Sequence, residues 1–254
     1  MIEATRFYVH HRNGYGLLEP NDVARRGFWE LNVETVPFET RDDVDALADL
    51  GPTVGVAGDI GDVQRALKRL GRPMPDPIDY PDQIMPFLGR SIWRSTLGAV
   101  REGCWREPVF VKSVAHKRLD GLVWKGDDDS RRRVVHVHDD EPVWCSEVRM
   151  FVSEYRVFVL DGELLDVRRY RGDWSRAPSR ATIEAMVATA SVASPRSLPK
   201  AMPRAYCIDV GVTDYRGTLL IEANDGYAFG TYGLAPVHCA RMLSARWQQL
   251  VEGA

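Results

Sequence analysis

The chain has 254 residues, of which 44% are hydrophobic and 27% are charged, and its formal net charge at pH 7 is −3. These values are typical of a globular protein that buries a substantial core, either as one large domain or as two or three compact subdomains. The small negative charge gives no reason to expect a nucleic-acid-binding protein that relies on bulk electrostatic attraction, and it leaves local basic patches open.

The first third of the chain alternates strand-like and helix-like segments. The strand-like segments are residues 5–10, 34–38 and 53–57, and the helix-like segments are residues 20–31, 41–50 and 62–70. Short apolar runs separated by helical patterns predict β-α-β units and a small parallel sheet. The proline-rich stretch 72–77 can continue neither a helix nor a central strand, so we expect a subdomain boundary near residues 72–88.

The middle third is expected to begin with a helix at residues 91–101. A buried strand at residues 108–112 then ends in Lys112, and a second short strand follows at residues 119–124. The charged segment 125–133 is typical of a solvated hairpin tip.

Residues 134–138 show strand-like alternation and contain His136 and His138. On a strand the two imidazoles would face the same way and could bind a transition metal. Because the chain has no matching distal pair, an exposed strand and turn is the preferred interpretation.

The last third begins with an Asp161-Gly162 turn between strand-like runs, which is a strong hairpin signal. A helix is expected at residues 182–193, and another at 236–251 closes the chain. Between these helices lies a second hairpin, formed by residues 207–211 and 218–226.

The second hairpin carries Asp209, Glu222 and Asn224. With the loop at residues 214–217, Asp209 falls opposite Glu222, and Asn224 points the same way as Glu222. Facing carboxylates are unfavourable unless a cation lies between them, and oxygen ligands are those that Mg²⁺ prefers. The pattern Asp…Glu-x-Asn therefore predicts a magnesium site, with a solvated polar strand face as the alternative.

The cysteines and the N-terminal segment indicate the compartment. The four cysteines are widely spaced and form no C-x-x-C pair, which is typical of reduced thiols. Residues 1–6 lack the basic and apolar run of a signal peptide, and the chain lacks the run of about 18 apolar residues that a membrane span needs. We therefore expect a cytoplasmic protein without a membrane partner.

Four motifs follow one another along the chain: the basic segment 89–94, the lysine strand 108–112, the segment 146–159 with two glutamates seven residues apart, and the Asp…Glu-x-Asn hairpin. In this order they resemble the ATP-grasp superfamily of ATP-dependent carboxylate ligases. The segments Tyr170-x-Gly172-Asp173 and Asn224-Asp225-Gly226-Tyr227 make the chain most similar to the R-two-K clade of this superfamily. The resemblance covers residues 85–250 by motif and the earlier part by element order.

This resemblance implies an α+β fold with an α/β lead-in. In the ATP-grasp fold, two α+β subdomains enclose the nucleotide behind a β-α-β pre-ATP-grasp subdomain. The implied boundaries are 1–85 for the lead-in, 86–148 for the small subdomain with the lysine strand, and 149–254 for the large subdomain with the metal site.

The resemblance also implies that ATP and Mg²⁺, or Mn²⁺ in its place, are the cofactors. The residues implied for the nucleotide are Arg94, Lys112 and Lys117 for the phosphates, and Glu147, Val148 and Glu154 for the adenine and ribose. Asp209, Glu222 and Asn224 would hold the metal.

Two departures from the family pattern bear on the catalytic residues. The loop after the lysine strand holds a single glycine, and Lys117 would replace by charge what backbone amides supply elsewhere. Cys207 stands where relatives often carry an arginine, two residues before the first metal aspartate. Arg156 and Arg168 then become the candidates for transition-state charge, with surface residues paired to Asp161 or Asp166 as the alternative.

The implied reaction joins a carboxylate to an amine through an acylphosphate and releases ADP and phosphate. The expected partners are small-molecule, amino-acid or peptide substrates, with a homodimer as one option for assembly. The glycine and aromatic loop 225–234 could line the acceptor pocket or be a packed loop. The alternative functions are a small-molecule or protein kinase that uses the same ATP site, and a non-catalytic nucleotide-binding module.

Overall fold

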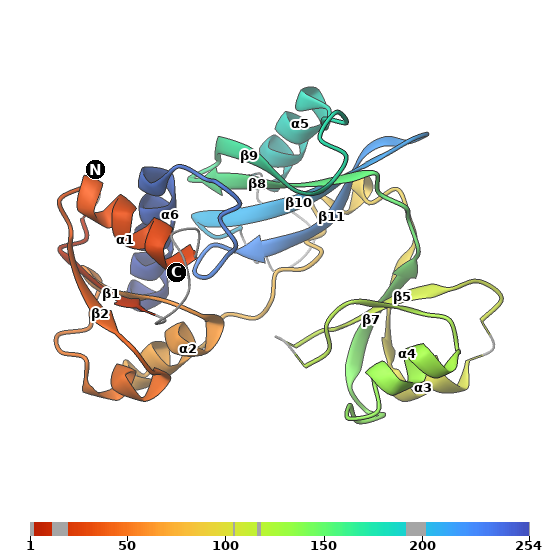
Figure 1. Ribbon diagram of the computed structural model, residues 1–254, viewed down its shortest axis with the longest axis horizontal. Helices are drawn as coiled ribbons and strands as arrows, with labels where there is room; N and C mark the ends of the chain where they lie inside the picture. The colour runs from red at the N-terminus through yellow and green to blue at the C-terminus, as the bar shows by residue number, and fades with distance from the viewer. Residues whose placement is uncertain (1–2, 12–19, 104, 116–117, 192–201, 254) are drawn as a thin grey trace.

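The computed structural model describes residues 3–11, 20–103, 105–115, 118–191 and 202–253 (Figure 1). Within these ranges the chain forms three separate sheets, one of three strands and two of four. The three-stranded sheet and the small sheet that contains β5 and β7 lie at opposite ends of the molecule, with the large sheet of β8 to β11 between them (Figure 1).

The first sheet confirms the predicted β-α-β lead-in. Its strands are β1 (Arg6–His10), β2 (Glu34–Phe38) and β3 (Val54–Ala57), and its helices are α1 (Pro20–Glu30) and α2 (Ile60–Arg69). All strands pair in parallel in the order β2-β1-β3. The helix predicted at 41–50 is instead a short 3-10 helix, η1 (Arg41–Ala46), which begins with a capping box between Thr40 and Asp43 and ends where Leu47 becomes extended.

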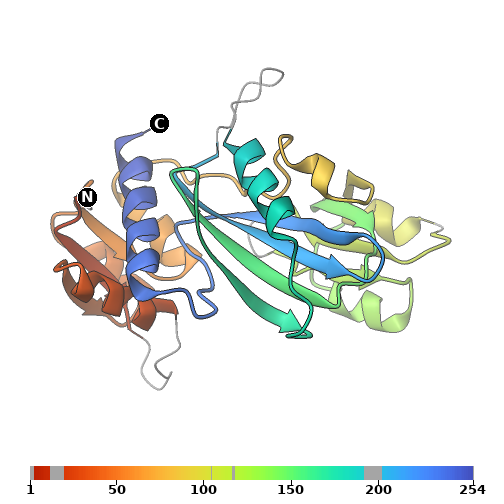
Figure 2. The same ribbon diagram turned by 90° about the horizontal axis from the view of Figure 1, so that it is seen from above.

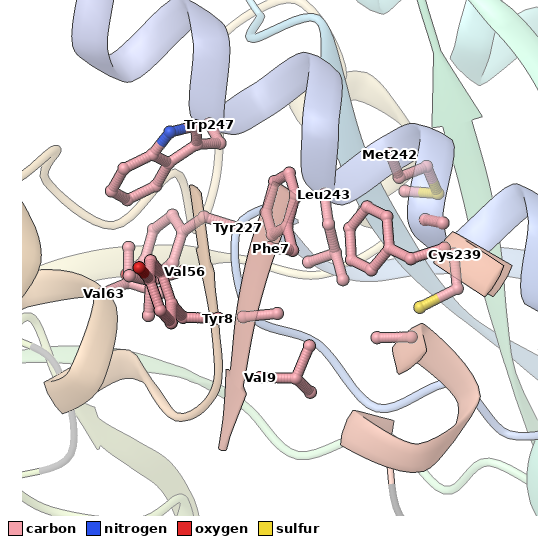
Figure 3. Packing of buried hydrophobic residues seen from close by; sticks show 14 of the residues in the cluster. Phe7, Tyr8, Val9, Val56, Val63, Tyr227, Cys239, Met242, Leu243 and Trp247 are labelled. Carbon is pink, nitrogen blue, oxygen red and sulfur yellow. The ribbon is translucent and has the colours of Figure 1, made fainter. Parts of the chain in front are cut away.

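The closing helix α6 (Pro236–Glu252) packs against this lead-in sheet and not only against its own neighbours in the chain. Figure 3 shows Leu243 and Trp247 of α6 beside Phe7 of β1. Helix α1 also packs against the first turns of α6, and the two approach so closely that a Cβ on Gly27 would lie 1.9 Å from the carbonyl oxygen of Pro236 (Figure 2). The C-terminal helix and the lead-in therefore share one hydrophobic core.

The small sheet is antiparallel and has the order β4-β7-β5-β6. Its strands are β4 (Ile92–Thr96), β5 (Val109–Ser113), β6 (Leu122–Trp124) and β7 (Pro142–Glu147), with helices α3 (Leu97–Glu102) and α4 (Asp128–Arg133). The predictions for the lysine strand and for the strand within 119–124 are confirmed.

Three other predictions for this region are wrong. The expected helix at 91–101 begins only at Leu97, because residues 92–96 pair with β7 and the Thr96 hydroxyl caps α3 by accepting the Ala99 N–H. Segment 125–133 is not a hairpin tip but contains α4, whose first turn is capped by Asp127. Residues 134–138 do not form the expected strand, and the next strand is β7. They follow α4 and begin with a turn in which Val134 is buried.

The large sheet is antiparallel in the order β11-β10-β8-β9. Its strands are β8 (Ser153–Leu160), β9 (Glu163–Gly172), β10 (Ala205–Thr213) and β11 (Gly217–Asp225), and α5 (Arg180–Ala190) packs on one face. Both predicted hairpins are confirmed. Asp161 and Gly162 have φ values of 51° and 80°, as an Asp-Gly turn of the I′ type requires. Among the described residues, the helices are too short or too polar to cross a membrane.

Candidate functional site

A cavity of about 630 Å³ lies between the small sheet and the large sheet. The small sheet contributes Phe110 and Lys112 of β5 and Leu122 of β6, and the large sheet contributes Asp209 and Glu222. The segment that connects the two sheets, residues 147–151, lines the cavity between them. The site predicted from the lysine strand and the acidic hairpin therefore has its two halves on opposite walls of one cavity.

The large sheet carries a row of four charged residues, of which Glu222 and Asp209 line the cavity. The strand register places Glu222 of β11 opposite Asp209 of β10, Asp209 opposite Arg156 of β8, and Arg156 opposite Arg168 of β9. Because directly paired residues share a face of the sheet, two carboxylates are followed by two guanidiniums. The predicted pairing of Asp209 with Glu222 is confirmed.

Asp209 is held by Arg156 from the neighbouring strand. The arginine Nε and Nη2 atoms donate to the two carboxylate oxygens of Asp209 at 2.8 and 2.7 Å. Asp209 is only 3% exposed, and burial raises the pKa of its carboxyl while the two bonds from Arg156 oppose this rise. The geometry is the two-point pairing that distinguishes arginine from lysine.

Glu222 is held by Lys112 from the opposite sheet. The Lys112 Nζ atom lies 2.6 Å from Glu222 Oε2 and 2.6 Å from Asp79 Oδ1. Burial works against the charge of Lys112, but Glu222, Tyr80 and Asp79 outweigh it and raise the pKa of the ammonium above its ordinary value. Lys112 is therefore a fixed cation at the wall of the cavity.

Asp79 is a site residue that sequence reasoning missed. It lies in the linker before the small sheet and contacts Lys112, which is 33 residues further along the chain. The only local signal in the sequence is an aspartate close to several prolines. In the structure its φ is 53°, a conformation that aspartate tolerates better than most residues. Such a signal predicts a turn and says nothing about a partner so distant in the sequence.

The three predicted metal ligands lie together. The Asn224 amide nitrogen donates to Asp209 Oδ2 at 3.1 Å and to Glu222 Oε1 at 3.2 Å. Two carboxylates and an amide oxygen fit the oxygen preference of Mg²⁺. Each carboxylate has about four lone-pair positions, and the protein partners of Glu222 do not occupy all of them. The described residues contain no group of three or more His, Cys, Asp or Glu suited to a metal, so further oxygens would have to come from a bound ligand. His136 and His138 accordingly belong to no such group, and both are exposed in the stretch after α4.

The predicted adenine and ribose residues line the same cavity. Glu147 and Val148 belong to the connecting segment, and Glu154 lies on β8. Next to them, the ring of Phe151 lies against Gly211, where a Cβ would be 2.2 Å from a ring carbon. Gly211 is therefore needed for this ring to lie so close to β10.

Arg94 is not among the residues that line the first cavity. It lines a neighbouring cavity of about 530 Å³ together with Asp79 and Trp144. Its guanidinium carbon lies 3.8 Å from the centroid of the Trp144 ring, a cation–π contact. Register places Arg94, Trp144 and Lys112 side by side on three adjacent strands, so Arg94 and Lys112 share a face of the sheet on either side of β7.

The remaining candidates differ in their surroundings. Arg168 pairs with Asp166 at 2.7 Å and its side chain is 43% exposed, which matches the surface alternative, whereas Arg156 pairs with neither Asp161 nor Asp166. Lys117 lies outside the described residues. In the loop 225–234, the Tyr232 ring stacks on Tyr170 at 5.0 Å and lies 5.2 Å from the Arg156 guanidinium, so this loop packs over the arginine.

Comparison with known structures identifies the fold. The chain is similar to D-alanine–D-alanine ligase from Bacillus anthracis, with 15% identity, a TM-score of 0.53, and coverage of 98% of this chain and 99% of that one. It is also similar to a D-cycloserine synthetase, with 11% identity, a TM-score of 0.59, and coverage of 95% and 99%. For the L-amino acid ligase from Bacillus licheniformis the identity is 10%, the TM-score 0.55, and the coverage 99% and 76%. These likenesses show the α+β ATP-grasp fold.

Comparison with families identifies the clade. No curated protein matches the chain. A family model described as the ATP-grasp domain, R-two-K clade family 2, matches residues 87–242, which is more than half of the chain. Both the predicted superfamily and the predicted clade are confirmed. The chain belongs to family 2 of the R-two-K clade of ATP-grasp domains.

Proposed function

We propose that this protein is an ATP-dependent ligase that joins a carboxylate to an amine through an acylphosphate and releases ADP and phosphate. The observation that carries this proposal is the convergence of Lys112 from the small sheet with Glu222 and Asp209 from the large sheet at one cavity. A lysine ammonium on one wall can contact the phosphates, and carboxylates on the facing wall can hold the metal ion that binds a triphosphate.

In this proposal the nucleotide runs along the cavity from the connecting segment to Lys112. Glu147, Val148 and Glu154 contact the adenine and ribose, and the Lys112 ammonium contacts the phosphates. Asp209, Glu222 and Asn224 hold Mg²⁺, or Mn²⁺ in its place. The bound ion supplies positive charge that neutralises the transferred phosphoryl group.

In this proposal Arg156 stabilises charge during transfer. It lies next to Asp209 on the neighbouring strand, so a guanidinium is present beside the metal residues although Cys207 occupies the position of the family arginine. Phosphoryl transfer depends on positioning and charge neutralisation, and a protein nucleophile is not required. Arg168 at the end of the row, and Lys117, are the further candidates for this role.

The second cavity supports a small acceptor substrate. It is separated from the first by the contact between Asp79 and Lys112, and Arg94 and the Trp144 ring form part of its wall. A guanidinium beside an aromatic ring suits a carboxylate attached to an apolar body. The ligases of similar fold are named for D-alanine and L-amino acids, which supports amino-acid or peptide substrates.

Product analysis tests the proposed function. Purified protein is incubated with ATP, Mg²⁺ and pairs drawn from a panel of amino acids and dipeptides, and ADP, AMP, inorganic phosphate and new amides are quantified by chromatography and mass spectrometry. Equal amounts of ADP, phosphate and amide are expected, and Lys112→Met should abolish all three while its circular dichroism spectrum stays unchanged. AMP as product, or ATP binding without turnover on the whole panel, would overturn the proposal. Phosphate retained on the acceptor would identify a kinase instead.

A further inference from the structure

Asp79 connects three parts of the molecule through separate groups. Its backbone carbonyl accepts the N–H of Ala223 at 2.7 Å, and the two residues form an isolated antiparallel bridge at the edge of the large sheet. Ala223 is the residue between Glu222 and Asn224 on β11. The linker is therefore fixed against the strand that carries two of the proposed metal ligands.

The side chain of Asp79 reaches the other sheet. Its Oδ1 accepts from Lys112 Nζ at 2.6 Å and its Oδ2 accepts from Trp144 Nε1 at 3.0 Å. Both partners lie on the small sheet, and the Asp79 side chain is only 13% exposed. One residue thus joins the lysine strand to the metal strand, with its backbone on one and its carboxylate on the other.

This contact restricts the direction of the Lys112 ammonium. A lysine ammonium has three N–H groups on a tetrahedral nitrogen. Glu222 and Asp79 accept two of them, each at 2.6 Å, and the bond to Cε takes the fourth direction. The third N–H consequently has one direction left. The Nζ atom also lies 4.9 Å from the centroid of the Tyr80 ring, and both Lys112 and Tyr80 line the 630 Å³ cavity.

We propose that Asp79 is a positioning residue that holds the Lys112 ammonium so that its remaining N–H meets a nucleotide phosphate. The proposal rests on the nucleotide site of the proposed function. It adds a residue outside the matched family segment, which begins at residue 87, so the lysine site depends on the linker as well as on the ATP-grasp domain.

Chemical labelling tests the contact without any nucleotide. The full chain is treated with an amine-acylating reagent, and labelling of Lys112 is followed by mass spectrometry relative to the exposed Lys68. Asp79→Asn keeps the side-chain size and suits the positive φ, because asparagine also tolerates that conformation. Lys112 should be labelled at least three times faster in Asp79→Asn than in wild type, and at the wild-type rate in Asp140→Asn, which removes an exposed carboxylate (93% exposed). An unchanged rate in Asp79→Asn would overturn the proposal.

Calorimetry with two ligands tests the role. The non-hydrolysable analogue AMP-PNP with Mg²⁺ presents three phosphates, whereas AMP presents one next to the ribose. Asp79→Asn should weaken Mg²⁺·AMP-PNP binding at least tenfold and AMP binding less than twofold. Equal losses for the two ligands would indicate general damage to the fold, and unchanged or tighter AMP-PNP binding would show that the contact does not serve phosphate binding; either result overturns the proposal. If wild type binds neither ligand, the proposed function fails, and the labelling result alone shows whether Asp79 holds Lys112.

Discussion

Arg156 and Asp209 form a two-point ion pair across neighbouring strands of the large sheet, with both arginine–carboxylate distances below 3 Å. Their side chains are 11% and 5% exposed. Two buried charges in this geometry depend on each other, because either one alone would lack an opposite charge in a medium that solvates it poorly. The row of charges described above is therefore part of the fold as well as part of the candidate site.

Replacing Arg156 should destabilise the protein much more than replacing its neighbour in the row. Arg156→Met leaves the Asp209 carboxylate buried without its cationic partner, and a loss of about 3–5 kcal/mol in the free energy of unfolding is expected. Arg168→Met is the matched control, because its exposed pair with Asp166 contributes about 0–1 kcal/mol. Urea unfolding measures both. Similar losses in the two variants would contradict the assignment of a buried pair.

Nucleotide binding should depend on a divalent ion. If Glu222 is a metal ligand, removing Mg²⁺ with a chelator should weaken the binding of AMP-PNP to wild type at least tenfold. Glu222→Gln should reduce this difference to less than threefold, since an amide is a weaker ligand than a carboxylate for a hard cation. Asp214→Asn, an exposed residue at the tip of the same hairpin, should leave the difference unchanged. Titration calorimetry provides the measurement, and equal affinities with and without Mg²⁺ in wild type would argue against the metal site.

The sequence was sufficient for those features that depend on neighbouring residues. The pairing of Asp209 with Glu222 follows from a short hairpin whose loop is marked by Gly217, and the turn at Asp161-Gly162 follows from the backbone conformations that these residues tolerate. In both cases the strands are adjacent in the chain, so register is set locally.

The features that sequence reasoning missed depend on distant partners. Strand β4 was predicted as a helix, although its five residues pair with β7, some fifty positions later. The contact between Lys112 and Asp79 spans 33 residues, and that between Arg156 and Asp209 spans 53. Neither contact has a local pattern, because any carboxylate at the right place in space would serve. The subdomain boundaries at 85 and 148 stay predictions.

The stability contribution of Glu222 should be lost in acid. Burial alone would raise the pKa of its carboxyl, but Lys112 and Asn224 outweigh burial and hold the pKa below the ordinary value of 4.5. A carboxyl whose pKa is lower in the folded than in the unfolded protein stabilises the fold above the unfolded value, and this stabilisation disappears as the pH falls through the folded value. Glu222→Gln should therefore be less stable than wild type at pH 7, and the difference should shrink below pH 4.5. Urea unfolding between about pH 7 and pH 3 measures it. A difference that stays constant over this range would show that Glu222 acts through packing and not through its charge.

Gly211 should control the position of the Phe151 ring and hence the shape of the cavity. In Gly211→Ala the new methyl carbon would lie 2.2 to 2.6 Å from three atoms of the ring, so the ring must move away from β10 toward the cavity that it lines. Overpacking of this kind costs about 1–3 kcal/mol of stability, and a displaced ring should also weaken AMP-PNP binding severalfold. The double variant Gly211→Ala/Phe151→Leu supplies the control, because a smaller side chain at 151 makes room for the methyl group. Stability measured by urea unfolding should recover at least half of the loss in the double variant relative to Gly211→Ala. If the two substitutions instead add independently, strain against Phe151 is not the cause, and the glycine is required for the backbone of β10 itself.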